Sequence, residues 1–200
     1  MSKFIRFVLV AALLIGTVAI FQPQVAQAQT KFPSYISGIQ VANLSNSVAT
    51  VVLTAYRESD GAQDGSPLQD TIPVNGSKTF FPIANVSVGF KGSFVISSNQ
   101  NIAAISNILS SDYSAGASYV GRSAGSTTVL LPLLHKDNSD HTSWFSVQNT
   151  SPSTVANITI KYSSGLGDVT AQIPPNASKT FYQSQEAHPI KVFAATITSD

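Results

Sequence analysis

Alternating apolar and polar residues predict β-strands through most of the chain after its apolar N-terminal region. The clearest alternation covers 156–162, where Ala156, Ile158, Ile160 and Tyr162 share one side and polar residues occupy the other. A period of two places successive side chains on opposite faces of a strand, so one face is expected to be buried and one solvated. No apolar pattern with the helical period of 3.6 is long enough to predict a helix. Further strands are expected at 48–56, 77–83, 89–98, 101–109, 128–134 and 143–149.

Three blocks of these strands recur in the same order, which predicts a tandem repeat of one β-rich module. The best-preserved block has seven of nine positions identical, at an offset of 101. The first block repeats at an offset of 106, so the first copy carries five extra residues between the two blocks. The aligned blocks are Ile39–Tyr56 with Phe145–Tyr162, Ile72–Phe80 with Ile173–Phe181, and Ser93–Asn99 with Ala194–Asp200.

The predicted organisation begins with a secretory signal peptide at 1–28. Lys3 and Arg6 precede an apolar stretch from Phe7 to Phe21, and Ala26-Gln27-Ala28 resembles a cleavage site. The alternative is an uncleaved membrane anchor, but the apolar stretch is short for one. We expect a first β-sandwich repeat at 29–111, a linker rich in Ser, Gly and Ala at 112–127, and a second repeat at 128–200.

The second copy stops at the point that matches Ser98-Asn99, whereas the first continues into a predicted closing strand, Gln100–Leu109. Either the second module lacks its last strand, or the sequence is a fragment of a longer array. We favour the fragment. A missing strand would leave an unpaired sheet edge, which invites pairing with another chain.

Composition narrows the class of partner. Without Lys3 and Arg6, the mature chain has nine basic residues against ten acidic ones and no basic cluster. Nucleic acid is therefore a poor candidate partner, and so is the membrane after signal cleavage. The chain has no cysteine, so each module must be held by its core alone.

A comparison of the copies at the offset of 106 predicts a contact surface. Val51, Leu53 and Ala55 align with a polar strand face in the second copy, so they are expected to form an exposed apolar strip. Such a strip usually meets a partner, the linker or the other module. The alternative is that the strand is buried on both faces, or that its faces are assigned the wrong way round. The aligned polar residues are Asn157, Thr159 and Lys161.

The densest polar cluster, 135–141, is a weak candidate metal site. Imidazole and carboxylate groups can ligate Zn²⁺ or Ca²⁺. However, their spacing matches no established motif, and the charge of Lys136 opposes a cation. A solvated loop before the next strand explains the cluster more simply, so we predict no metal and no cofactor. The candidate ligands are His135, Asp137, Asp140 and His141.

No catalytic arrangement can be argued from the sequence, so we predict that the protein is not an enzyme. There is no G-x-S-x-G motif, no cysteine and no phosphate-binding loop. Glutamate occurs only at 58 and 186, which disfavours a paired-carboxylate glycosidase site. Trp144, the only tryptophan, is the best single candidate for a surface contact, including sugar stacking, although partial burial is the commoner role.

Three sequence stretches carry a family resemblance: Leu-Pro-Leu-Leu-His at 131–135, Val-Gln-Asn-Thr-Ser at 147–151, and Ile-Pro-Pro-Asn-Ala-Ser-Lys-Thr at 173–180. With them, the mature chain resembles the uncharacterised secreted tandem β-sandwich repeat proteins of environmental bacteria. The resemblance implies immunoglobulin-like antiparallel sandwiches and an extracellular, often cell-surface, role. It implies no catalytic residues.

The sequence therefore predicts an all-β protein with two tandem immunoglobulin-like modules after a signal peptide. The expected function is a secreted structural, adhesion or assembly module at the cell surface or in the extracellular matrix. Its partners would be other surface proteins or further repeats. The alternative is a carbohydrate-binding accessory module of a larger secreted protein, with polysaccharide as its partner.

Overall fold

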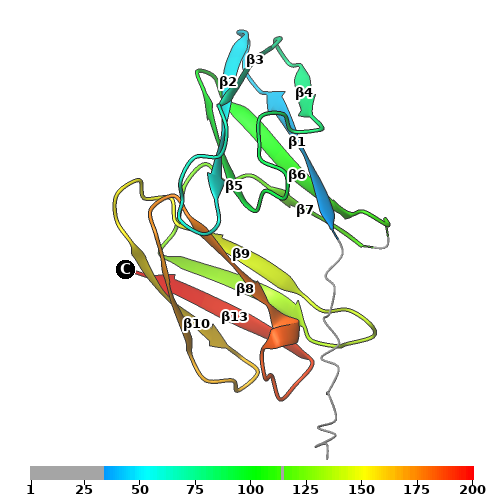
Figure 1. Cartoon of the computed structure of the whole chain (residues 1–200), viewed down its shortest axis with the longest axis vertical. Coiled ribbons are helices and arrows are strands. Elements are labelled where there is room, and N and C mark those ends of the chain that lie inside the picture. Colours follow the sequence, from blue (N-terminus) through cyan, green and yellow to red (C-terminus); the bar gives the residue numbers. More distant parts are fainter. Residues whose placement is uncertain (1–33, 114) are drawn as a thin grey trace, which may run out of the picture. The chain divides into compact units, whose positions relative to one another are not determined.

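The computed structural model describes residues 34–113 and 115–200, so the predicted signal peptide lies outside the described residues. The described chain is all-β, with thirteen strands and one turn of 3-10 helix, η1 (Gln183–Gln185) (Figure 1). All the strand pairs are antiparallel. The all-β prediction is confirmed.

The N-terminal half contains seven strands in two sheets, of order β4-β1-β6-β7 and β3-β2-β5. Its buried cluster includes Ile39 and Val41 from the first sheet and Val51, Leu53 and Ile72 from the second, so the two sheets share one core. The strands are β1 (Tyr35–Asn43), β2 (Ala49–Arg57), β3 (Leu68–Ile72), β4 (Ser77–Phe80), β5 (Gly92–Ser98), β6 (Ile102–Ser110) and β7 (Gly116–Val120).

The C-terminal half contains six strands in sheets of order β11-β10-β13-β8 and β12-β9. Its core includes Ile158, Ile160 and Phe193 from the larger sheet and Phe181 from the smaller one. The strands are β8 (Thr128–His135), β9 (Trp144–Gln148), β10 (Ala156–Tyr162), β11 (Val169–Ile173), β12 (Ser178–Tyr182) and β13 (Val192–Ser199).

Five strands recur in both halves with the same neighbours: β1 and β9, β2 and β10, β3 and β11, β4 and β12, and β5 and β13. The halves differ at one side. In the N-terminal half, β6 pairs with β1 and brings Ile102 and Ala104 against the core. In the C-terminal half, β8 pairs with β13 instead and contributes Leu131 and Leu134. The two cores are thus closed by added strands in opposite sheets.

Strand pairing corrects one of the sequence alignments. Val51 pairs with Ser98, and Ile158 pairs with Ser199, the counterpart of Ser98. Val51 therefore corresponds to Ile158 and not to Asn157. The cause is a longer turn before β10. The side chain of Asn43 reaches the carbonyl four residues on, whereas that of Asn149 reaches the carbonyl five residues on.

This slip of one residue exchanges the two faces of the strand. Val51, Leu53 and Ala55 are 0%, 1% and 4% exposed, so they point into the core. The prediction that they form an exposed strip for a partner is wrong. The alternative, a reversed face assignment, is correct.

The repeated nine-residue block forms the same tight turn in both halves. The N–H of Gly76 donates to the carbonyl of Pro73 at 3.0 Å, and Asn75 has φ of 55°. The N–H of Ala177 likewise donates to Pro174 at 3.1 Å, and Asn176 has φ of 59°. Asparagine tolerates this left-handed conformation better than most residues, which explains why it recurs there.

A buried asparagine ties each turn to the end of the preceding strand. The Nδ2 of Asn149 donates to the carbonyls of Thr154, Ile173 and Pro174 at 2.7, 3.0 and 3.1 Å. Its Oδ1 accepts the N–H of Ser151 at 2.9 Å. Asn43 makes the equivalent four bonds in the N-terminal half. Each of the two asparagines therefore also caps a turn through its side-chain oxygen.

The range predicted as a linker, 112–127, contains a strand. β7 pairs with β6 and extends its sheet, although it consists of small and polar residues with Tyr119 and Val120. Every residue of β7 is exposed. Its formation depends on the backbone ladder with β6, which residue composition does not reveal.

Candidate functional site

The loop 135–141 does not assemble its four candidate metal ligands. The Nδ1 of His135 lies 3.0 Å from the amide of Asn138, and the Nδ1 of His141 lies 2.6 Å from the carbonyl of Ser139. Asp137 accepts the hydroxyl of Thr142 at 3.0 Å. Within the described residues, no three histidine, cysteine or acidic side chains are grouped to hold a metal ion. The polar groups, Asp140 among them, belong to a loop that is organised by its own hydrogen bonds.

Trp144 begins β9 and is half-buried. Its ring centroid lies 6.3 Å from that of Tyr35, with the planes tilted by 56°. Tyr35 is 41% exposed, so the pair offers some aromatic surface. The tilt means that the two rings do not form one flat platform.

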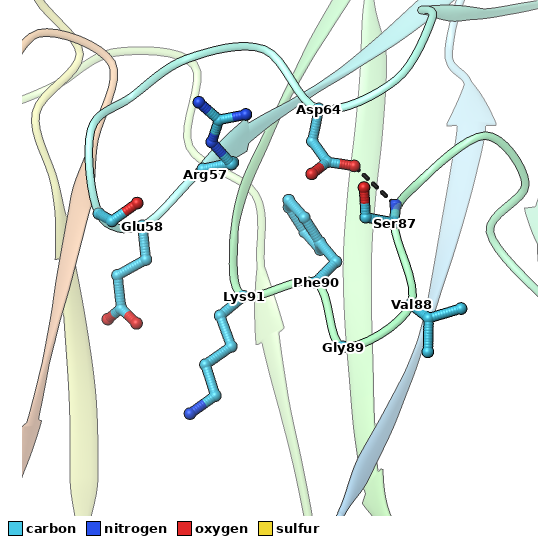
Figure 2. Close-up of a pocket in the computed structure, with 9 residues that line it drawn as sticks. Arg57, Glu58, Asp64, Ser87, Val88, Gly89, Phe90 and Lys91 are labelled. Carbon is cyan, nitrogen blue, oxygen red and sulfur yellow. Dashed lines mark hydrogen bonds between the residues drawn. The ribbon is translucent and has the colours of Figure 1, made fainter.

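An open pocket of about 470 Å³ lies in the N-terminal half (Figure 2). It lies between the loop after β2 and the loop before β5. Asp64 is 7% exposed and holds these loops together, because its carboxylate accepts the N–H of Ser87 at 2.6 Å. The lining residues are Arg57, Glu58, Ser59, Asp64, Ser87, Val88, Gly89, Phe90 and Lys91.

Three of the four charged side chains that line this pocket are already engaged in hydrogen bonds, namely those of Arg57, Glu58 and Asp64. Arg57 forms two hydrogen bonds to Asp60, at 3.0 and 2.6 Å, and this pairing lowers the pKa of Asp60 to about 2. The carboxylate of Glu58 accepts the N–H of Thr180 at 2.7 Å. Few polar groups remain available to bind a ligand. We therefore interpret the pocket as a gap between two loops and not as a binding site.

A second polar cluster, which sequence reasoning missed, surrounds His188. Its Nδ1 lies 2.9 Å from the hydroxyl of Ser164, and its Nε2 lies 2.9 Å from the Oε1 of Gln183. The ring stacks on Phe193 with centroids 4.0 Å apart and meets Tyr162 edge-on at 4.7 Å. Burial lowers the pKa of His188, and the charge of Lys136 lowers it further.

The hydrogen-bonded chain from Ser164 through His188 to Gln183 resembles the arrangement of a catalytic triad. However, Ser164 is 6% exposed and Gln183 is fully buried, so a substrate has no approach to the hydroxyl. The cluster instead joins the β10–β11 connection to η1 and to the segment before β13. It is an internal polar network that fixes these loops over the core.

Exposed apolar side chains also lie on the edge strand β8. Leu130 and Leu133 are 69% and 60% exposed, and we call them the β8 strip. Exposed apolar residues on an edge strand are a hazard for soluble proteins and commonly mark a contact surface. The Leu-Pro-Leu-Leu stretch was visible in the sequence, but its pattern did not show which leucines would face outward.

Comparison with known proteins finds no matching family model, no similar curated protein and no similar solved structure. Within residues 34–113 and 115–200, no helix has the length and apolar character needed to cross a membrane.

Proposed function

We propose that the chain is a secreted, non-catalytic structural module that assembles with other surface or matrix proteins. In this proposal, the two halves are immunoglobulin-like β-sandwich units in tandem. Two observations support that architecture: each half has two antiparallel sheets around its own buried cluster, and five strands recur with the same neighbours. The N-terminal region, 1–28, would direct secretion and be removed.

The β8 strip carries the functional part of the proposal. Leu130 and Leu133 expose most of their surface, although Leu131 and Leu134 in the same strand face the core. Full burial of a leucine side chain stabilises by about 1.5–3 kcal/mol, so two exposed leucines offer substantial contact energy. Because these two leucines are exposed on an edge strand, this surface is suited to binding a protein partner.

The test compares the distribution of the secreted chain between the culture medium and the washed cell-surface and matrix fraction. We expect Leu130→Lys with Leu133→Lys to move the chain into the medium. Leu44→Lys is the matched control, because Leu44 is 63% exposed in the turn after β1. Equal retention of the double variant and the control would refute the role of the strip, and retention of the chain in the cytoplasm would refute secretion.

Carbohydrate binding is the second candidate, and the aromatic pair of Trp144 and Tyr35 is the observation that favours it. Binding of the purified chain to insoluble polysaccharides tests this function. If this function is correct, Trp144→Ala abolishes the binding, whereas Leu130→Lys with Leu133→Lys leaves the binding unchanged. Binding that persists in Trp144→Ala would exclude the aromatic pair as the sugar site.

A further inference from the structure

The smaller sheet of the C-terminal half has one open edge, along β9. Within the described chain, β9 pairs only with β12. The N–H of Asn149 donates to the carbonyl of Ala177 on the β12 side. Because backbone groups alternate along a strand, Trp144, Ser146 and Gln148 direct their N–H and C=O groups to the opposite edge.

The equivalent edge in the N-terminal half, along β1, is fully paired with another strand. β6 pairs with β1 along the whole of Tyr35–Asn43. The N–H of Leu44 continues this ladder to the carbonyl of Asn101 at 2.9 Å. Thr150 is the counterpart of Leu44, so the backbone of β9 presents the geometry that accepts a strand in the other half.

Two other edges of this half, along β8 and β12, carry features that discourage strand pairing, but β9 does not. β8 has a proline at 132, next to a register shift between Phe193 and Ala195. On β12, the N–H of Thr180 is already bound by Glu58. Prolines, bulges and charges are the usual protection of a sheet edge. The sequence of β9, Trp-Phe-Ser-Val-Gln, contains none of them.

We propose that β9 pairs with β9 of a second copy of this chain, antiparallel about a two-fold axis at Ser146. The inference rests on the assembly function proposed above and names the partner of this edge. The pairing would give a sheet of order β12-β9-β9-β12, with the same number of strands as β4-β1-β6-β7. A two-stranded sheet is marginal alone, so doubling it is favourable.

The second copy is favoured as the occupant because the edge matches itself. Antiparallel pairing centred on Ser146 places Trp144 opposite Gln148 of the other copy, and Ser146, exposed and small, opposite its own equivalent. Phe145 and Val147 face the core, so the joined strands also extend the apolar interior across the axis. Such a two-fold contact closes at a dimer.

β8 lies alongside this edge and supplies further apolar surface. The N–H of Ser143, just before β9, donates to the carbonyl of His135 at the end of β8 at 2.8 Å. At the other end, a Cβ on Gly125, just before β8, would lie 2.8 Å from the hydroxyl of Thr150. The two strands therefore run side by side in opposite sheets, and the β8 strip flanks the proposed dimer axis.

Cross-linking through a single introduced cysteine tests the pairing directly, because the natural chain has none. Residues opposite each other in a hydrogen-bonded antiparallel pair have Cα atoms about 5.5 Å apart, within the range of a disulfide. We expect Ser146→Cys in residues 29–200 to form a disulfide-linked dimer on mild oxidation. Thr170→Cys is the control, because Thr170 is exposed and lies on β11, which is an edge strand of the other sheet in this half. Equal cross-linking of the two variants, or none in Ser146→Cys, would overturn the proposal.

Proline substitution provides the complementary measurement. Ser146→Pro removes an N–H that faces outward, which an edge strand tolerates, but it blocks the new ladder. Light scattering after size exclusion should give a dimer for the natural chain and for Thr170→Pro, and a monomer for Ser146→Pro, with circular dichroism showing that all three fold. A dimer that survives Ser146→Pro, or growth beyond a dimer, would refute the β9 pairing.

The two proposals fail in different ways. If Ser146→Cys does not cross-link but surface retention still depends on Leu130 and Leu133, the β9 dimer is wrong and the assembly function stands. If the dimer forms but the chain does not remain with the surface fraction, the pairing stands and the surface function is wrong.

Discussion

Replacement of Asn149 by alanine should destabilise the C-terminal half by about 4 kcal/mol. The side chain makes four hydrogen bonds and is 7% exposed, and its bond to the carbonyl of Ile173 is buried. A typical bond contributes about 1 kcal/mol net, and a buried carbonyl left without a donor costs about 1–3 kcal/mol. The loss is large against a total stability of about 5–15 kcal/mol.

Urea unfolding followed by circular dichroism measures this change through the midpoint and slope. Asn149→Asp sharpens the test, because it keeps the acceptor for Ser151 but places a carboxylate against three carbonyl oxygens. It should be at least as destabilising as alanine. Asn157→Ala, on the exposed strand face, should cost less than about 1 kcal/mol. An Asn149→Ala midpoint equal to that of Asn157→Ala, or a stable Asn149→Asp, would refute the reasoning.

Three further predictions follow from burial and backbone conformation. Leu53→Lys should prevent folding or cost at least about 4 kcal/mol, because it places an unpaired charge at a position 1% exposed; a normal thermal melt would contradict this. Gly65→Ala should destabilise by at least about 2 kcal/mol in thermal melts, because Gly65 has φ of +67° and a Cβ would lie 1.5 Å from the carbonyl oxygen of Asn85; an unchanged melting temperature would contradict it. The lowered pKa of His188 means that the unfolded chain binds more protons, so its contribution to stability is present above about pH 6.5 and is lost as the pH falls through the lower native value. His188→Gln should reduce this loss in urea titrations between pH 7 and 5, and an identical pH profile would argue against the assignment.

The sequence was most informative where local chemistry alone determines the structure. The Pro-x-Asn-Gly/Ala turn and the turn-capping side chains of Asn43 and Asn149 are features of this kind, because both depend on residues close in the chain. The strand at 128–134 was also predicted within one residue of β8. These features need no knowledge of which strands pair.

The faces of β2 could not be assigned from the sequence. Its central residues are all apolar, β-branched or small, so either side fits a buried face. The identical pair Tyr56 and Tyr162 favoured the wrong offset, although the structural counterpart of Tyr162 is Ala55. Only the strand register, set by tertiary pairing, resolves such a slip. β7 and the His188 network escaped prediction for the same reason, since both depend on contacts between distant segments.

The buried asparagines also affect the choice of expression host. Asn43-Leu44-Ser45 and Asn149-Thr150-Ser151 both match the acceptor sequence for N-linked glycans. The nitrogen that would carry the sugar is the one that donates to three carbonyls in each half. Glycosylation and folding therefore compete for the same atom. In a eukaryotic secretory pathway, chains modified there before folding could not form the native turn, so a bacterial host is the better source of this protein.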